Sequence, residues 1–459
     1  MATVPKKIVS LFVNKKTMGL IVLQSSNPKF SHLIHKNPER GLIVKPNRNG
    51  HFYCFYPMTT EGTSRVDRYV IYFRDGFTAA SYKSNPDSKF EYMDILRYTS
   101  PEIPLNALRE CLRSSYTKQH EDDLPGFAHI FTSTVKVDAK PGQMAKFTRH
   151  FPKFEVAMDP LVANVNRITI KSGETLHRLL NFVNVLFTYI AVLNKDHYAL
   201  QESQLENQLR SINLLEADYF IRYLLSSKMI TSEKLFQRFK PDLECHPKQV
   251  IDMQYGNTAE QRRNYIRRLL SFNMDVVDVG CGEGFYAIPF AKKLKRIAPL
   301  KSYYALDTDE SCIGNLKHKK ERSELDNLQL FTSLDDMLAR LNECEGPLDV
   351  IITEVVEHMD RRSGQVMIAR ILKETKWQKV VITTPNYGFN QFYLMDSPYR
   401  HTDHVWEATQ DEFREYVSVI MDEVKPTRGY DVQYLDIGDR VNGLSVTQGV
   451  LISARPGPT

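Results

Sequence analysis

The sequence lacks the cysteine pattern and the apolar leader of a secreted protein. Its six cysteines include no pair at CxxC spacing, which argues against a disulfide framework or a zinc ribbon and favours a reducing compartment. No apolar run approaches the ~20 residues that cross a bilayer. Residues 1–16 contain no long apolar segment ahead of a small-residue cleavage site. These absences predict a cytoplasmic protein with no membrane partner.

Neither sign of charge dominates the chain. It has 60 basic and 55 acidic residues and a net charge of +5, which permits nucleic acid as a partner without requiring it. A chain of 459 residues is too long for one compact core, so two or three domains are expected. Changes in pattern predict an N-terminal accessory region at 1–240, a linker with the helix that follows it at 241–262, and a C-terminal domain at 263–459.

The N-terminal half alternates strand-like and turn-like stretches, including residues 51–57 and 66–74. The apolar run at 172–193 is predicted to be a buried core helix, with Ser172 as its N-cap and Glu174 in its first turn. An amphipathic helical region follows at about 201–238. This half is therefore expected to be an α+β region.

The C-terminal half has a different pattern. Short apolar runs alternate with helical segments: DVVDVG, YYALD, LDVIITE and KVVITTP. Two more strand-like runs, YDVQYLDIG and VTQGVLISA, end the chain. This alternation predicts a doubly wound, Rossmann-like α/β sheet.

A glycine-rich loop follows the first of these strands. Its glycines are Gly280, Gly282 and Gly284. They allow the backbone to turn tightly and to approach a ligand closely, and the next helix offers free N–H groups. Such a loop suits a dinucleotide or S-adenosylmethionine (SAM). Asp278 and Glu283 favour SAM, because an acidic wall suits its cationic sulfonium and amino group but not a pyrophosphate.

The next two strands supply the other expected cofactor contacts. Asp307, at the end of the second strand, can accept both ribose hydroxyls, and Ser333 and Leu334 fall where the adenine should lie. The alternative is a glycine-rich turn without a ligand, but strand, loop, helix and distal aspartate all agree. This half resembles the class I SAM-dependent methyltransferase fold, a seven-stranded sheet with an antiparallel final hairpin.

Metal-ligand residue types follow the fourth strand. Glu354, Glu357 and His358 have i, i+3, i+4 spacing, so one helical turn would place them on one face. Two carboxylates and an imidazole are sound ligands for Mg²⁺ or Mn²⁺. The alternative is a surface turn neutralised by Arg361 or Arg362.

A loop after the fifth strand carries more polar residues to the same end of the sheet, where open α/β sheets bind ligands. These are Arg400, His401, Asp403 and His404. His404 is the better candidate for a second imidazole ligand, and the role of His401 stays open. Basic residues elsewhere could hold phosphates or form solvated helix faces: Arg262, Arg263, Arg267, Arg268 and Lys317 to Lys320.

The segments TEVVEHMD, TTPNYGFN and RHTDHVWEATQDEF together resemble the small-RNA 2′-O-methyltransferase family. The resemblance implies methylation of the 3′-terminal ribose of RNA. It also implies that Glu354, Glu357, His358 and His404 bind a metal that grips the 2′- and 3′-hydroxyls. In the last segment Trp406 stands where the family has Phe.

The N-terminal half extends the resemblance over most of the chain. SHLIHKNPERG, FYCFYP and LLNFVNVLFTYIAVLNKDHY resemble the accessory region of bacterial members. The resemblance implies RNA with a free 3′ end as substrate, and a polynucleotide kinase–phosphatase–ligase as partner in RNA repair. Two alternatives stay open: a small-molecule O-methyltransferase, which would not explain the RHTDH loop, and an N-terminal half that mainly activates a ligase.

Overall fold

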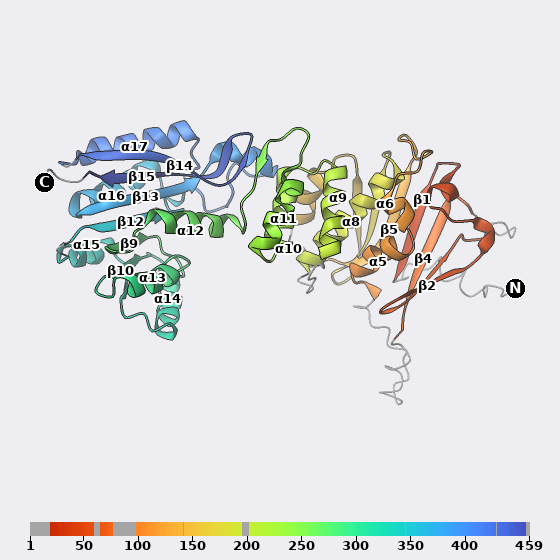
Figure 1. The fold of residues 1–459 in the computed structure, drawn as a ribbon, viewed down its shortest axis with the longest axis horizontal. Coiled ribbons are helices and arrows are strands. Elements are labelled where there is room, and N and C mark those ends of the chain that lie inside the picture. The colour runs from red at the N-terminus through yellow and green to blue at the C-terminus, as the bar shows by residue number, and fades with distance from the viewer. Residues whose placement is uncertain are drawn as a thin grey trace, which may run out of the picture. The chain divides into compact units, whose positions relative to one another are not determined.

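A computed structural model describes residues 19–58, 65–76, 98–140, 142–194, 202–344, 346–427 and 429–455 (Figure 1). Residues 1–16, for which the absence of a leader was predicted, lie outside these ranges, as do residues 195–198 of the accessory-region motif. The chain divides into two compact units. The first comprises Met1–Met229 and Cys245–Pro247, and the second comprises Ile230–Glu244 and Lys248–Thr459.

The first unit is an antiparallel sheet with helices. Its strands are β1 (Leu20–Ser25), β2 (Ile43–Asn47), β3 (Gly50–Phe55), β4 (Arg68–Asp75), β5 (His129–Lys136), β6 (Glu155–Val162) and β7 (Val165–Ser172). Its helices are α2 (Phe30–Leu33), η1 (Pro38–Arg40), α5 (Glu102–Glu110), α6 (Arg113–Thr117), α7 (Gln143–Arg149), α8 (Leu176–Leu193), α9 (Glu202–Leu214) and α10 (Tyr219–Met229). The strand order is β2-β3-β4-β1-β5-β7-β6. The predicted α+β architecture is confirmed.

Helix α8 is the centre of this unit. It packs against α5, α6, α9 and β5, and the prediction of a buried core helix is confirmed. By length and composition α8 could cross a membrane, contrary to the expectation that no apolar run is long enough, but 78% of the apolar window is buried inside the unit. The predicted N-cap is wrong. Ser172 still pairs with His129 in the sheet, and the side chain of Thr175 accepts the hydrogen bond from the Arg178 N–H.

The second unit is a three-layer α/β structure. Its strands are β8 (Ile251–Asp252), β9 (Asp275–Val279), β10 (Tyr303–Leu306), β11 (Leu328–Phe331), β12 (Leu348–Thr353), β13 (Trp377–Pro385), β14 (Tyr430–Val441) and β15 (Leu444–Ala454). Its helices are α11 (Glu233–Glu244), α12 (Thr258–Leu269), α13 (Ala287–Ile297), α14 (Glu310–Arg322), α15 (Leu334–Asn342), η2 (Val356–His358), α16 (Arg361–Glu374), η3 (Tyr387–Tyr393) and α17 (Gln410–Val424). The sheet order is β11-β10-β9-β12-β13-β15-β14-β8.

This topology is that of a class I SAM-dependent methyltransferase, as predicted. Five parallel strands, β11 to β13 in sheet order, are followed by the antiparallel β15–β14 hairpin. The short strand β8 adds an eighth strand beside β14. Because all five parallel strands point the same way, the loops after β9, β10, β12 and β13 meet at one edge of the sheet.

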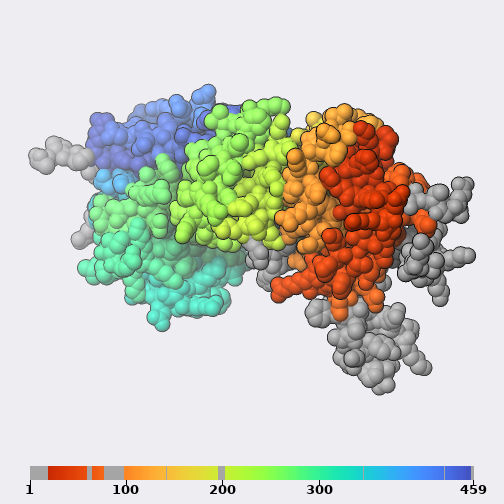
Figure 2. Space-filling model, turned by 45° about the vertical axis from the view of Figure 1, so that its right-hand side comes forward, coloured from red at the N-terminus to blue at the C-terminus, as the bar shows by residue number. Residues whose placement is uncertain are grey.

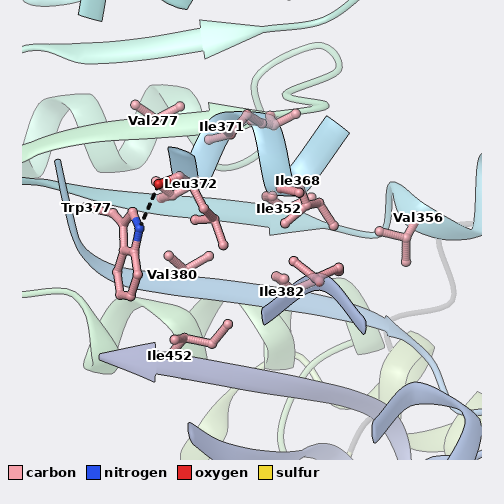
Figure 3. Close-up of a cluster of buried hydrophobic side chains, with 14 of the residues drawn as sticks. Val277, Ile352, Val356, Ile368, Ile371, Leu372, Trp377, Val380, Ile382 and Ile452 are labelled. Atoms are coloured by element: carbon pink, nitrogen blue, oxygen red, sulfur yellow. Dashed lines mark hydrogen bonds between the residues drawn. The ribbon is translucent and has the colours of Figure 1, made fainter. Parts of the chain in front are cut away.

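The sheet is buried on both faces because successive strand residues point to opposite sides. Val276 and Val381 pack under helices α12, α13 and α14. Val277 and Val380 face the other core, which α15, α16 and α17 cover. Figure 3 shows this second core, where the indole N–H of Trp377 donates to the Leu372 carbonyl at 3.1 Å. The nearly continuous apolar strands seen in the sequence are therefore those of a doubly covered parallel sheet.

Helices overrun both ends of the segment 241–262, which was predicted to be a linker with the helix that follows it. Helix α11 continues through Pro241 to Glu244, and α12 crosses the predicted boundary at residue 262. Helix α12 begins at Thr258 because Asn257 and Glu260 form a capping box, in which each side chain accepts from the backbone N–H of the other at 3.0 Å. The division of the chain into domains at 240 and 262 stays a prediction.

Candidate active site

The glycine loop after β9 has the conformation that its composition predicted. Gly280, Gly282 and Gly284 all have positive φ, at 73°, 51° and 87°, a region that other residues enter at a cost. A Cβ atom at Gly280 would clash with the Val355 side chain, whereas a Cβ at Gly282 would meet nothing within 4 Å. The backbone at Gly282 therefore borders open space, where a ligand can approach it closely.

Asp307 stabilises this loop through its carboxylate. It accepts the Gly282 N–H at 2.7 Å through Oδ2 and the Asp309 N–H at 3.0 Å through Oδ1. Asp307 stands at the end of β10, half-buried beside the loop. This is the placement that the sequence required for a carboxylate on the cofactor ribose, and the assignment stays a prediction.

The other two acidic groups near the loop are less free than the sequence suggested. Asp278 is fully buried in β9, and it accepts a hydrogen bond from the Tyr303 hydroxyl at 2.9 Å. Burial raises the pKa of Asp278 to about 7, and the charge of Asp307 adds to the shift. Glu283 does not line the loop as a free anion, because it accepts from Lys319 at 2.8 Å and from Asn315 at 3.0 Å.

Ser333 and Leu334 lie at the start of α15, after β11. The Ser333 side chain caps this helix by accepting from the Asp336 N–H at 3.4 Å. Leu334 is partly buried and packs against the core on that side of the sheet. Both residues lie at the edge expected for the adenine, and their contact with the cofactor stays a prediction.

The turn after β12 sets Glu354 apart from Glu357 and His358, the other two predicted ligands that it carries. The 3-10 turn η2 begins only at Val356, so Glu354 precedes it, with a φ of +55°. Glu354 therefore does not share one helical face with Glu357 and His358. Its carboxylate forms an ion pair with the Arg262 guanidinium at 2.9 Å and accepts a hydrogen bond from the Thr383 hydroxyl at 3.2 Å. The role of Glu354 as a metal ligand stays a prediction.

The carboxylate of Glu357 is fully buried, with an exposed fraction of 0%. One oxygen, Oε2, accepts from the Thr384 hydroxyl at 3.1 Å. The other oxygen, Oε1, is buried without a hydrogen-bond partner. Burial raises the pKa of Glu357 well above its usual range, and the nearby charge of Glu354 raises it further. A buried, unpartnered carboxylate oxygen is costly unless a cation binds it.

His404 meets this carboxylate from the loop after η3. The Val405 N–H donates to the Glu357 carbonyl at 2.8 Å, and the Trp406 indole N–H donates to the Val356 and Met359 carbonyls at 2.8 and 2.9 Å. The departure from the family pattern at Trp406 therefore provides a donor that fixes the loop against η2.

A carboxylate behind His404 sets the orientation of its ring. Glu407 Oε1 lies 2.6 Å from Nδ1 of His404, and both residues are buried. Glu407 also accepts from the Arg400 N–H and from the Asn390 amide. A buried carboxylate at Nδ1 keeps the proton there, so Nε2 is left as the atom for a metal. The role of Glu407 was not predicted, although its position three residues after a candidate ligand was a usable signal.

The three residues Glu357, His358 and His404 come together as one cluster. Each offers one ligand atom, and these atoms all lie within 4.8 Å of one another. The His358 ring stands edge-on to the His404 ring, with 4.8 Å between centroids, and His358 Nδ1 lies 3.3 Å from Asp403. His401 lies behind His404, at 5.1 Å between ring centroids. One carboxylate and two imidazoles with an unpartnered oxygen among them fit a divalent cation.

Removing the support behind His404 has a predictable effect on this cluster. The Glu407→Gln variant is expected to bind Mn²⁺ about 10- to 100-fold more weakly, because the amide cannot hold the Nδ1 proton as the carboxylate does. Calorimetric titration of Mn²⁺ into the protein measures this, with Glu415→Gln on the exposed face of α17 as the control. Equal Mn²⁺ affinity in the two variants would show that Glu407 does not affect His404 as a metal ligand.

Two family models match the chain. The Hen1 N-terminal domain matches residues 20–248, and a methyltransferase domain matches residues 276–376. A chain of the Pnkp1/Rnl/Hen1 RNA repair complex is similar with 23% identity and a TM-score of 0.75, covering 95% of this chain and 100% of that chain. A second structure of the Pnkp1/Rnl/Hen1 complex gives a TM-score of 0.73 at the same identity and coverage. A search of curated proteins found no match.

Proposed function

This chain belongs to the Hen1 family and carries a SAM-dependent methyltransferase domain, and from that premise we propose that it methylates the 2′-hydroxyl of the 3′-terminal ribose of RNA with a divalent metal ion. The observation that carries the proposal is the cluster of Glu357, His358 and His404. The cluster lies at the same edge of the sheet as the cofactor loop. Val355, which immediately precedes η2, places its side chain against Gly280 of that loop. A methyl donor bound at that loop would therefore be a neighbour of the cluster.

The ligand set suits a sugar diol as its target. A Mg²⁺ or Mn²⁺ ion held there would lower the pKa of a bound hydroxyl, which is a poor nucleophile at neutral pH. Only the last nucleotide of an RNA has free 2′- and 3′-hydroxyls side by side, so a site that needs both recognises the terminus. The protein orients the acceptor: Thr384 and the backbone of Val405 fix Glu357, and Glu407 fixes His404. Such positioning can supply much of the rate.

Three RNAs that differ only at the 3′ end test this function. We expect transfer of a labelled methyl group from SAM to RNA with a 3′-terminal diol, and at least about 100-fold less to RNA ending in 2′-deoxyribose or in a 3′-phosphate. Chelation of divalent metal should stop the reaction, and Mn²⁺ or Mg²⁺ should restore it. Equal transfer to all three RNAs would reject the proposal. Transfer to small catechols but to none of the RNAs would favour the small-molecule alternative.

We also propose that the chain works with a polynucleotide kinase–phosphatase–ligase in RNA repair. The support is the likeness of the fold, over 95% of this chain, to a chain of the Pnkp1/Rnl/Hen1 complex. Methylation before ligation would protect the rejoined RNA from a second cut at the same site. The full chain should co-elute with such an enzyme during size-exclusion chromatography and raise its ligation rate. Separate elution with an unchanged ligation rate would count against this partner.

A further inference from the structure

A groove beside the cofactor loop is lined by none of the residues of the metal cluster. Its volume is about 590 Å³, and it lies between α12, the loop, α13 and α14. Residues that line it include Arg263, Glu283, Phe285, Ile288, Lys319 and Arg322. The segment from α12 to α14, green to teal in Figure 2, reaches the surface of the second unit.

The groove is positively charged. Arg263, Lys319 and Arg322 line it against one carboxylate, Glu283, which Lys319 already neutralises at 2.8 Å. Among the described residues, no carboxylate pairs with the guanidinium groups of Arg263 and Arg322. Two uncompensated arginines facing a hollow attract an anion.

The groove also presents an aromatic ring. Phe285 is 41% exposed, although it is a large apolar side chain. The Arg263 guanidinium lies over this ring, 4.3 Å from its centroid. An exposed ring beside cationic groups is the combination that binds single-stranded nucleic acid, since bases stack on the ring and phosphates meet the cations.

The positive charge continues beyond the groove along α12 and α13. Arg267 follows Arg263 by one helical turn, and Lys293 and Arg296 lie on the face of α13 that Pro289 shares with the groove. Burial lowers the pKa of Lys293, and the charges of Arg267 and Arg296 lower it further, so the three cations lie close together. Within the described ranges none of them has an acidic partner. From Pro289 in the groove to Arg296 the helix α13 advances by seven residues, or about 10 Å. The groove and the basic strip together are therefore longer than a single phosphate group.

We propose that this groove and strip bind the RNA strand on the 5′ side of the nucleotide to be methylated. The inference rests on the proposed function, because the direction of the RNA strand follows from the position of its 3′-terminal nucleotide at Glu357. Helix α12 joins the two places: Arg262 pairs with Glu354 at the active site, and its neighbour Arg263 lines the groove. The sequence left both residues open between phosphate binding and a solvated helix face. Only Arg263 is placed to reach a phosphate, since Arg262 is 9% exposed.

The test is a double charge reversal, Arg263→Glu/Arg322→Glu, in the full chain. The matched control is Lys376→Glu/Lys425→Glu, which makes the same change in charge at the amino end of β13 and the carboxyl end of α17. Fluorescence anisotropy measures the binding of a dodecamer RNA with a 3′-terminal diol and of a trinucleotide with the same end. Calorimetry with SAM checks that each variant is folded.

We expect the double variant to bind the dodecamer at least about 10-fold more weakly than the control does. The number of ions released on binding, taken from the salt dependence of the affinity, should fall by about two. The advantage of the dodecamer over the trinucleotide should disappear. The same affinity and salt dependence as the control would overturn the inference, even if the wild type methylates RNA. Unchanged RNA binding with loss of the repair-enzyme complex would assign the surface to a protein and overturn it too. Failure of the wild type to methylate any RNA would instead defeat the proposed function.

Discussion

The Glu357→Gln variant should lose methyl transfer to RNA, with kcat/KM lowered on the order of 10³-fold or more, equivalent to about 4 kcal/mol of transition-state stabilisation. The substitution keeps the size of the side chain and removes the charge that would hold a divalent cation beside His358 and His404. A neutral amide is a poor ligand for Mg²⁺ or Mn²⁺ at a site with only one clustered carboxylate. The loss should therefore appear in metal binding as well as in the rate.

The loss of activity in Glu357→Gln should not come with a loss of stability. In the metal-free protein Glu357 is fully buried with one oxygen unpartnered, which costs free energy of folding. The variant should have a Tm no lower than that of the wild type, and it should bind SAM with unchanged affinity by calorimetry. Glu415→Gln, an exposed substitution on α17, should change none of these quantities. Retained methyl transfer by Glu357→Gln would remove the cluster from the mechanism.

The fold of the second unit could be predicted because its strands can be recognised in the sequence by their apolar residues. Buried parallel strands are apolar on both faces, so β9, β12 and β13 stand out in the sequence as short runs between charged helices. The same topology brings the residues after β12 and β13 to one edge, which is why Glu357 and His404, 47 positions apart in the sequence, were predicted to meet. Their presence in one cluster agrees with that prediction.

The remaining features depend on which atoms meet in three dimensions. Arg262 was expected on a basic helix face, but it turns inward to Glu354 and to the Tyr286 hydroxyl at 2.8 Å. Nothing in the local sequence distinguishes Arg262 from Arg263, because α12 is basic on two adjacent faces. Ser172 was a plausible helix cap by residue type, but its pairing in β7 takes precedence. Sequence patterns predicted the elements, whereas the contacts of polar side chains between elements required the structure.

Gly280→Ala should destabilise the domain and remove both the cofactor site and the metal cluster. The residue has a φ of +73°, which costs an alanine about 1–2 kcal/mol, and its Cβ would clash with Cγ2 of Val355, which adds about 1–3 kcal/mol for overpacking. Val355 immediately precedes η2. If it moves to relieve the clash, Glu357 moves with it, so Mn²⁺ binding should fall together with SAM binding.

Two other glycines make this prediction specific. Gly282→Ala meets no atom within 4 Å, so it should cost only the backbone term of about 1–2 kcal/mol, and it should abolish SAM binding while Mn²⁺ binding is retained. Gly314→Ala, inside α14 with nothing within 4 Å, should raise stability by up to about 1 kcal/mol and leave both ligands bound. Chemical denaturation and calorimetry separate the three variants. Loss of SAM but not of Mn²⁺ in Gly280→Ala would mean that the cofactor loop and η2 move independently, and that Val355 does not couple the two halves of the site.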